Sequence, residues 1–216
     1  MRPQPYRDRR HAGQVLADHL RHLACRESLL VLGLPRGGVP VAYEVAQMIN
    51  APLDVFVVRK LGLPGHEEFA IGALASGGTR VLNRTGLSFD EALVEDITRR
   101  ESAELARRER LYRGDQPPLQ LAGRSVVLVD DGLATGATMR AAAQAVRKKD
   151  PASLCIAAPV GAPQACRMLE AIADEVVCPA QPEDFTAVSL WYASFPQTGD
   201  EEVQALLEDA RHPAGD

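Results

Sequence analysis

The sequence predicts an α/β protein built on an open, doubly wound parallel sheet of about five strands. Short apolar runs of the length of a strand recur along the chain, and helical patterns follow several of them. Continuous apolar runs, without alternation, are typical of strands that are covered on both faces. The runs occupy residues 28–32, 53–58, 125–129, 154–158 and 175–177.

Helices are expected between these runs. Apolar residues at helical spacing predict a helix over 11–24, with Asp8 as its start signal, and another that follows the glycines at 37–38 and ends near Ile49. Two more are predicted over 138–149 and 163–173, after the third and fourth strands. We therefore expect one domain over residues 1–216.

Two segments interrupt this alternation. Residues 60–114 are expected to hold a flexible loop, a β-hairpin turning at 76–78 and a long charged helix that opens on a Ser88/Glu91 capping box and ends at Gly114. Residues 179–216 are expected to form a small hood, irregular over 184–195, and a last helix opened by Thr198 and Glu201.

Composition excludes several classes of protein. With 24 Lys and Arg against 29 Asp and Glu, the net charge is 24 − 29 = −5, which argues against binding nucleic acid by bulk charge, so we expect no nucleic-acid partner. The four cysteines form no C-x-x-C pair that would indicate zinc or a disulfide framework. We expect no secretory leader and no membrane partner, and we predict a cytoplasmic protein.

The segment 126–138 carries the clearest chemical signal. An apolar strand ends in Asp130 and Asp131, and a turn of small residues then enters a helix. Backbone N–H groups at such a turn can close around a phosphate, and the positive end of the helix favours the anion. The predicted phosphate site comprises Ala134, Thr135, Gly136, Ala137 and Thr138.

The two acids are expected to serve a neighbouring sugar. Ionised carboxylates only accept hydrogen bonds, so Asp130 and Asp131 suit the adjacent hydroxyls of a ribose and water around a magnesium ion. A charged pair at the carboxyl edge of a sheet is costly to bury without such partners.

This segment resembles the phosphoribosyl pyrophosphate (PRPP) signature of the type I phosphoribosyltransferases, with four apolar residues, two acids, two further residues and Ala-Thr-Gly-x-Thr. The resemblance implies an enzyme of nucleotide salvage that uses Mg²⁺, with catalytic roles for Asp130, Asp131, Arg36 and Lys60. It also implies PRPP and a small planar acceptor as substrates, and a homodimer. Gly132 departs from the pattern, because the family usually has a larger aliphatic residue there.

Two further segments resemble the family's pyrophosphate site. The loop 34–38 follows the first strand, and its Arg36, Gly37 and Gly38 are matched to the pyrophosphate-binding positions, with Pro35–Arg36 as the place for a strained or cis peptide. Lys60 stands where the flexible catalytic loop begins and is expected to reach pyrophosphate. His66, Glu67 and Glu68 lie in this loop and are candidate proton acceptors. The alternative is that they are simply solvated loop residues.

The acceptor is expected to lie under the hood, where Trp191 and Tyr192 can stack on a planar base. The alternative is that these rings close the core. Ala134 stands where hypoxanthine-type relatives carry an acid, so a proton acceptor from the loop or the substrate itself is needed.

Two other functions stay open. A protein of the same fold could sense PRPP or a nucleotide without transferring it, and its only candidate nucleic-acid surface is a cluster of arginines in the long helix, interleaved with glutamates. Mixed charge favours a solvated helix instead. Transfer to an acceptor that is not a base, or the reverse reaction, is the third possibility.

Overall fold

A five-stranded parallel sheet forms the centre of the molecule. The computed structural model describes residues 6–63, 66–82 and 90–212. The sheet has the order β2-β1-β6-β7-β8 and every neighbouring pair is parallel, which confirms the predicted fold class. The strands are β1 (Leu29–Gly33), β2 (Leu53–Val55), β6 (Ser125–Val129), β7 (Ser153–Ala157) and β8 (Glu175–Val177).

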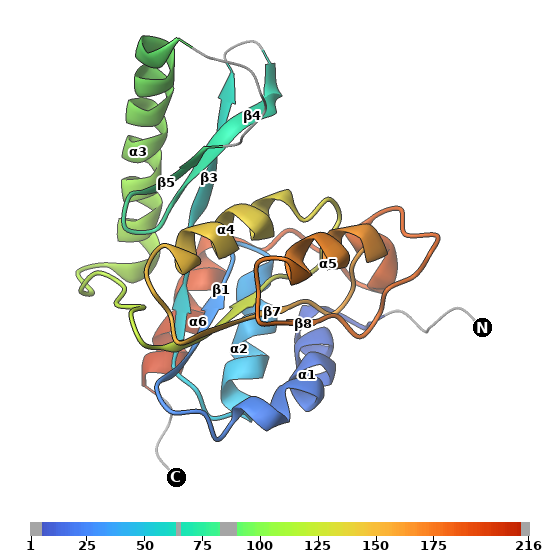
Figure 1. Ribbon diagram of the computed structural model, residues 1–216. Coiled ribbons are helices and arrows are strands. Elements are labelled where there is room, and N and C mark those ends of the chain that lie inside the picture. The colour runs from blue at the N-terminus through green and yellow to red at the C-terminus, as the bar shows by residue number, and fades with distance from the viewer. Residues whose placement is uncertain (1–5, 64–65, 83–89, 213–216) are drawn as a thin grey trace.

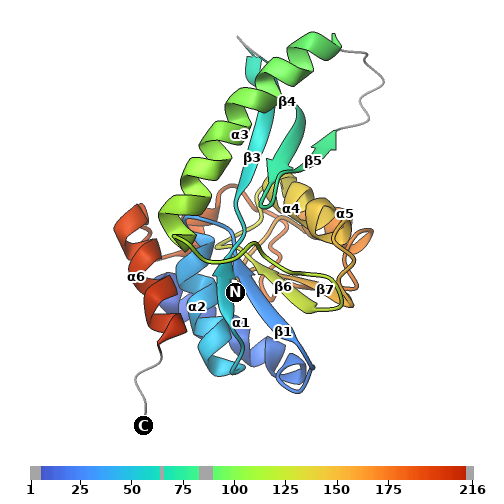
Figure 2. The same ribbon diagram turned by 90° about the vertical axis from the view of Figure 1, so that its left-hand side faces the viewer.

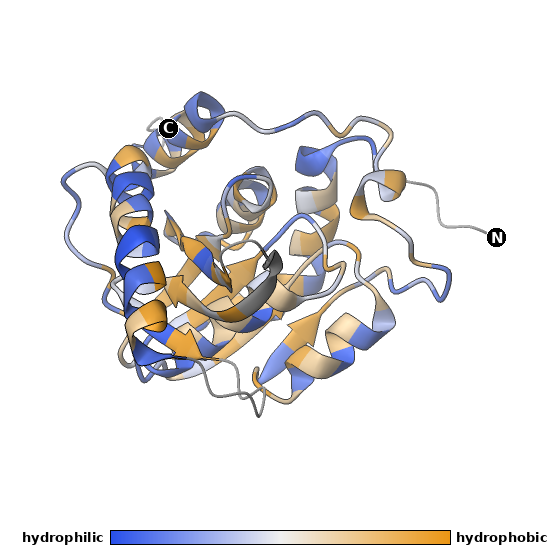
Figure 3. Ribbon diagram, turned by 90° about the horizontal axis from the view of Figure 1, so that it is seen from above, coloured by the Kyte–Doolittle hydropathy of each residue, from blue (hydrophilic) through white to orange (hydrophobic). Residues whose placement is uncertain are grey.

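Helices cover both faces of this sheet (Figure 1). Helices α1 (Arg9–Leu20), α2 (Gly38–Met48) and α6 (Asp200–Arg211) lie on one face, and α4 (Ala137–Arg147) and α5 (Pro163–Glu170) lie on the other. Along β1, Val31 packs into the first layer and Leu30 into the second, as the alternation of side chains along a strand requires. The strands are apolar, and the surrounding helices carry hydrophilic faces (Figure 3).

The expected second strand divides in two. Only β2 joins the parallel sheet, and the chain then enters β3 (Val58–Leu63), where Val58 pairs with Ala75. Phe56 and Val57, between the two strands, are buried. Apart from Asp54 the run is apolar, which is compatible with either sheet, so its pattern does not indicate the change of partner.

An arm extends from the sheet (Figures 1 and 2). Strands β3, β4 (His66–Ala75) and β5 (Thr79–Leu82) form a three-stranded antiparallel sheet beside the long helix α3 (Glu91–Arg113). The β4–β5 hairpin turns through Gly77 and Gly78, at φ values of 76° and 73°, as predicted. The segment that begins at Lys60, expected as a loop, starts as a strand because it pairs with β4.

Helix starts differ from the predicted capping boxes. The side chain of Asp8 caps α1 as expected, by accepting a hydrogen bond from the backbone N–H of His11. Asp90, and not the predicted Ser88, caps α3, and Ser88 lies outside the described residues. Gly199 precedes α6 and makes no side-chain cap, so the predicted Thr198 box is wrong, and Thr198 is buried instead.

The remaining described elements are short. Two 3₁₀ helices span Arg21–Leu23 and Val188–Trp191. Within the described ranges, no helix combines the length and the apolar character that crossing a membrane requires.

Candidate functional site

The candidate site lies where the chain reverses its direction of travel across the sheet. The chain passes from β1 to the β2 edge, but from β6 it passes through β7 to β8 at the opposite edge. The loops after β1 and β6 therefore separate at the carboxyl ends of neighbouring strands, which is the usual place for a ligand in such a sheet. The backbone N–H of Leu34 donates to the carbonyl of Val129 at 2.9 Å and holds the two loops together.

The acidic pair follows β6 directly. The backbone N–H of Asp131 donates to Oδ1 of Asp130 at 2.9 Å, and Oδ2 of Asp131 accepts from Nε of Arg9 at 2.8 Å. Burial, followed by repulsion from Asp131, raises the pKa of Asp130 well above its ordinary value. Burial also raises the pKa of Asp131, against the opposing effect of Arg9. Cationic or hydrogen-bond-donating partners are thus favoured at this pair.

The turn that follows the acids lines a pocket of about 140 Å³, to which Asp130 also contributes. Gly136 has a φ of 69°, a left-handed conformation that favours glycine, and α4 begins at the next residue. The structure therefore brings Asp130 together with all five residues of the predicted phosphate site. The N-terminus of α4 lies at this pocket and favours an anion there.

The glycines of the 34–38 loop fit tightly against the acidic segment. A β-carbon at position 37 would overlap the carboxylate of Asp131, and one at position 38 would lie 2.7 Å from the carbonyl oxygen of Val129. The Pro35–Arg36 peptide bond is cis, at the place matched to the family's loop. These close approaches require glycine at both positions.

The two predicted cations have other neighbours in the structure. Arg36 is partly exposed, and its Nη1 lies 3.9 Å from Oδ1 of Asp200, at the start of α6. Lys60 is exposed on β3, opposite Ala73. The side chains of His66, Glu67 and Glu68 lie outside the described residues.

The predicted hood rests against the N-terminal segment. Tyr192 is buried, its ring lies between those of Tyr6 and Phe195 at centroid distances of 5.6 and 4.8 Å, and its hydroxyl donates to the carbonyl of Asp131 at 2.6 Å. Burial raises the pKa of Tyr192 and keeps this hydroxyl a donor. Trp191 is half-buried and packs against the same cluster. Tyr192 thus anchors the hood to the acidic segment.

Gly132, the departure from the family pattern, lies under the hood. A β-carbon there would lie 2.5 Å from Cγ1 of Val188. Val188 therefore occupies the space that a larger residue at position 132 would need.

The sequence patterns did not identify Arg9. It stands in the first turn of α1, a turn that contains no acidic residue although Asp8 caps the helix. Arginines in a first turn face the positive end of the helix dipole, which is unfavourable unless they have other partners. The run Arg9–Arg10 was therefore a usable signal, but only the fold reveals that its partner is Asp131.

Two carboxylates are the metal-binding groups that this site offers. Among the described residues, no group of three or more His, Cys, Asp or Glu side chains is placed to hold a metal. One oxygen of each acid already accepts a hydrogen bond. Such a pair fits Mg²⁺, which commonly keeps several waters and takes its other ligands from substrate phosphates.

Comparisons with known proteins agree with this geometry. A family model described as "Phosphoribosyl transferase domain" matches residues 9–190. A Mycobacterium tuberculosis protein named "Putative phosphoribosyl transferase Rv0571c" is 46% identical over 206 residues. That match covers 94% of this chain but 46% of the relative, so the chain spans about half the length of the curated relatives it matches.

Solved structures show the same fold. TT1426 from Thermus thermophilus is 46% identical with a TM-score of 0.84, and the match covers 94% of this chain and 97% of that one. The AQ2163 protein from Aquifex aeolicus shares the fold alone, with 14% identity and a TM-score of 0.50 over 92% of this chain and 84% of that one. Together with the family match, these similarities confirm the resemblance seen in the sequence: the chain belongs to the phosphoribosyl transferase family.

Proposed function

We propose that this chain is a Mg²⁺-dependent phosphoribosyltransferase that moves the 5-phosphoribosyl group of PRPP to a nitrogen atom of a small planar acceptor. One observation carries the proposal. Asp130 and the small-residue turn before α4 line a single pocket, so groups suited to a sugar diol and to a phosphate stand side by side. The 5-phosphate is assigned to Ala134–Thr138 by this proximity.

The reaction breaks the bond between C1 of the ribose and pyrophosphate, and the electron pair leaves with pyrophosphate. The acceptor nitrogen forms the new bond to C1 and passes its proton to a base of the segment that begins at Lys60 or to the substrate itself. Positive charge develops on the sugar as the bond breaks, and ionised Asp130 and Asp131 are placed to stabilise that charge and to fix the ribose.

The departing pyrophosphate is assigned to the 34–38 loop. Gly37 and Gly38 lie against the acidic segment, which places their backbone beside the sugar site. At 3.9 Å, the pair between Arg36 and Asp200 is long, so Arg36 can exchange it for pyrophosphate. Lys60 is exposed on β3 and is the second proposed cation. A magnesium ion bound through water to Asp130 and Asp131 would offset the charge of the leaving group.

We propose that the acceptor lies under the hood, near Gly132 and Trp191. Tyr192 takes a supporting part there, since its ring is buried and its hydroxyl binds the backbone of Asp131. The stacking residue that we propose is therefore Trp191.

The test is binding and turnover of PRPP. Calorimetry with PRPP and MgCl₂ should show binding, and pyrophosphate release should be measured against a panel of purine, pyrimidine and non-base acceptors. Absence of PRPP binding by the folded chain would refute the proposal.

Asp131→Asn tests the assignment at residue level. It should lower kcat by about 100-fold or more while the melting temperature changes by no more than about 3 °C. The control is Asp18→Asn, which removes an exposed acid paired with Arg21 at 2.8 Å and should leave both quantities unchanged. A loss of stability that accounts for the loss of turnover would count against the catalytic role of Asp131.

A further inference from the structure

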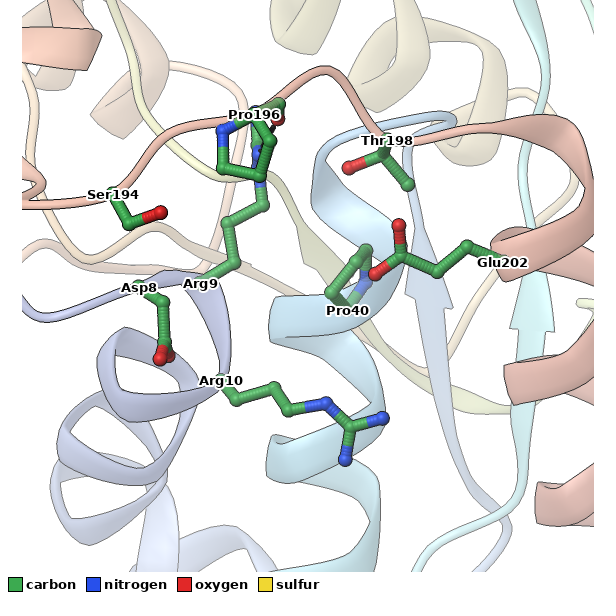
Figure 4. A pocket seen from close by; sticks show the side chains of 8 residues that line it. All are labelled: Asp8, Arg9, Arg10, Pro40, Ser194, Pro196, Thr198 and Glu202. Carbon is green, nitrogen blue, oxygen red and sulfur yellow. Dashed lines mark hydrogen bonds between the residues drawn. The ribbon is translucent and has the colours of Figure 1, made fainter.

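Arg9 joins three parts of the molecule. Its Nε donates to Oδ2 of Asp131 at 2.8 Å, its Nη1 donates to the carbonyl of Pro196 at 2.6 Å, and its guanidinium carbon lies 3.7 Å from the ring centroid of Phe195. Helix α1, the acidic pair and the segment 188–196 therefore meet at one side chain. Figure 4 shows Arg9 extending from α1 toward Pro196, beside a pocket of about 140 Å³.

These contacts suit arginine in particular. The side chain of Arg9 is 11% exposed, so its charge has lost most of its water and depends on the partners around it. A planar guanidinium can donate in two directions and still present a face to an aromatic ring, whereas a lysine ammonium is a point charge.

Arg9 also fixes where the carboxylate of Asp131 lies. A β-carbon at Gly37 would overlap that carboxylate and would lie 3.2 Å from Nε of Arg9. The guanidinium and the 34–38 loop therefore both lie against the same carboxylate oxygen, Oδ2. Tyr192 holds the backbone of the same residue through its hydroxyl.

We propose that Arg9 is a positioning residue that couples the acidic pair to the segment 188–196. A ligand that binds Asp131 therefore changes the environment of this segment through Arg9. The coupling rests on the proposed function where PRPP is the ligand. The placement of the hood by Arg9 is independent of the proposed function, because Pro196 and Phe195 contact Arg9 without any ligand.

The chain carries its own probe for this coupling. Trp191 is the single tryptophan of the sequence and lies in the segment that Arg9 holds. Its emission can therefore be followed without labelling while PRPP and MgCl₂ are added, and calorimetry on the same samples gives the affinity.

Three variants separate the effects. Arg9→Gln removes the charge and the planar fork, Arg9→Lys keeps the charge alone, and Arg10→Gln removes the same charge one residue away. Arg10 is the matched control because its side chain is 57% exposed, pairs with Glu44 at 3.5 Å and points away from Arg9 toward α2 (Figure 4). Thermal melts establish that each variant is folded.

We expect wild type and Arg10→Gln to bind PRPP with a change in Trp191 emission. Arg9→Gln should bind about tenfold more weakly and lose the emission change. Arg9→Lys should recover most of the affinity but not the emission change, because an ammonium does not reach all three partners at once. Equal behaviour of Arg9→Gln and Arg10→Gln in both measurements would overturn the coupling.

Acrylamide quenching of Trp191 without ligand distinguishes a failure of the Arg9 proposal from a failure of the proposed function. Arg9→Gln and Arg9→Lys should both be quenched faster than Arg10→Gln, whether or not PRPP binds. If wild type does not bind PRPP, the proposed function fails while the quenching result still decides the placement of the hood. Quenching that is equal in all variants would refute that placement.

Discussion

Asp130 is a half-buried carboxyl group at a pocket, and its surroundings do little to stabilise its ionised form. Burial, and then repulsion from Asp131, raises its pKa well above the ordinary value of an aspartate, while a hydrogen bond from the backbone of Asp131 and the more distant Arg9 oppose this effect. The folded protein therefore binds a proton here more tightly than the unfolded chain does. The contribution of this proton to stability is present at low pH and is lost as the pH rises through the folded pKa.

Asp130→Asn should consequently stabilise the protein at neutral pH. Asparagine is neutral and can still accept the hydrogen bond from the backbone N–H of Asp131. We expect a gain in the free energy of unfolding on the order of 1 kcal/mol at pH 8, together with a loss of activity. Denaturant unfolding at pH 8 and pH 5 measures the gain in the free energy of unfolding. The gain should shrink at pH 5, and a gain that is independent of pH would contradict the burial argument.

Gly37 tests the close approach between the two loops. In Gly37→Ala the new methyl group must displace the carboxylate of Asp131, so PRPP binding should weaken by about tenfold or more. Gly199→Ala is the control, because no atom lies within 4 Å of a β-carbon there and its φ is −82°. Calorimetry compares the two variants, and equal affinities would show that the overlap is relieved without moving Asp131.

Helix α3 is charged along its length, but its last two residues, Tyr112 and Arg113, are buried. Arg99 and Arg100 pair with Asp96, and Arg107 and Arg108 pair with Glu104, all within the helix, as the mixed charge predicted. The arginines at 107 and 108 lower the pKa of Glu104 to about 2 through their hydrogen bonds.

Arg113 is the exception to the expected solvated face. Its side chain is 9% exposed, donates to both carboxylate oxygens of Asp54 on β2, and donates to the carbonyl of Pro117 at 2.7 Å. It therefore ties the end of α3 to the edge of the parallel sheet.

Removing this buried cation should be costly. Arg113→Ala should lower the free energy of unfolding by about 3 kcal/mol, because Asp54 and the Pro117 carbonyl lose their donor in a partly dehydrated site. Arg100→Ala, at a side chain 60% exposed, should cost less than about 0.5 kcal/mol. Urea unfolding of both variants measures the difference, and similar losses would refute the distinction between the exposed middle of the helix and its buried end.

The sequence predicted the presence of helices and strands better than the residues at which they begin and end. Strand β6 and the turn before α4 were predicted because an apolar run ends abruptly at two charges and then at small residues. The caps of α3 and α6 were wrong because polar residues cluster before both helices, and local spacing alone does not determine which one begins the helix. Arg9, Tyr6 and Val188 were missed as parts of the site because their contacts join segments more than 50 residues apart.

The whole molecule is acidic, and most of its helical arginines are already paired. A net charge of −5 argues against the sensing alternative as a nucleic-acid binder, since the six arginines of α3 stand among six acids of the same helix and four of them pair with Asp96 or Glu104. The expected homodimer stays a prediction.

We therefore expect no retardation of a duplex or single-stranded DNA or RNA probe at about 150 mM salt and micromolar protein. A gel-shift titration repeated at lower salt measures this. A shift that persists at physiological ionic strength and is lost in Arg99→Gln/Arg100→Gln would favour the sensing function over the transferase.

The backbone link between Tyr6 and the hood bears on how the protein is handled. Tyr6 donates to the carbonyl of Trp191 and accepts from Ala193, so the stretch around residues 6–7 completes the cover near the acids. An affinity tag is therefore best attached after α6, because this helix lies on the other side of the molecule from α5 and the hood in Figure 1. Trypsin cleavage after Arg7 would detach one border of this cover, so intact mass should be checked before any assay.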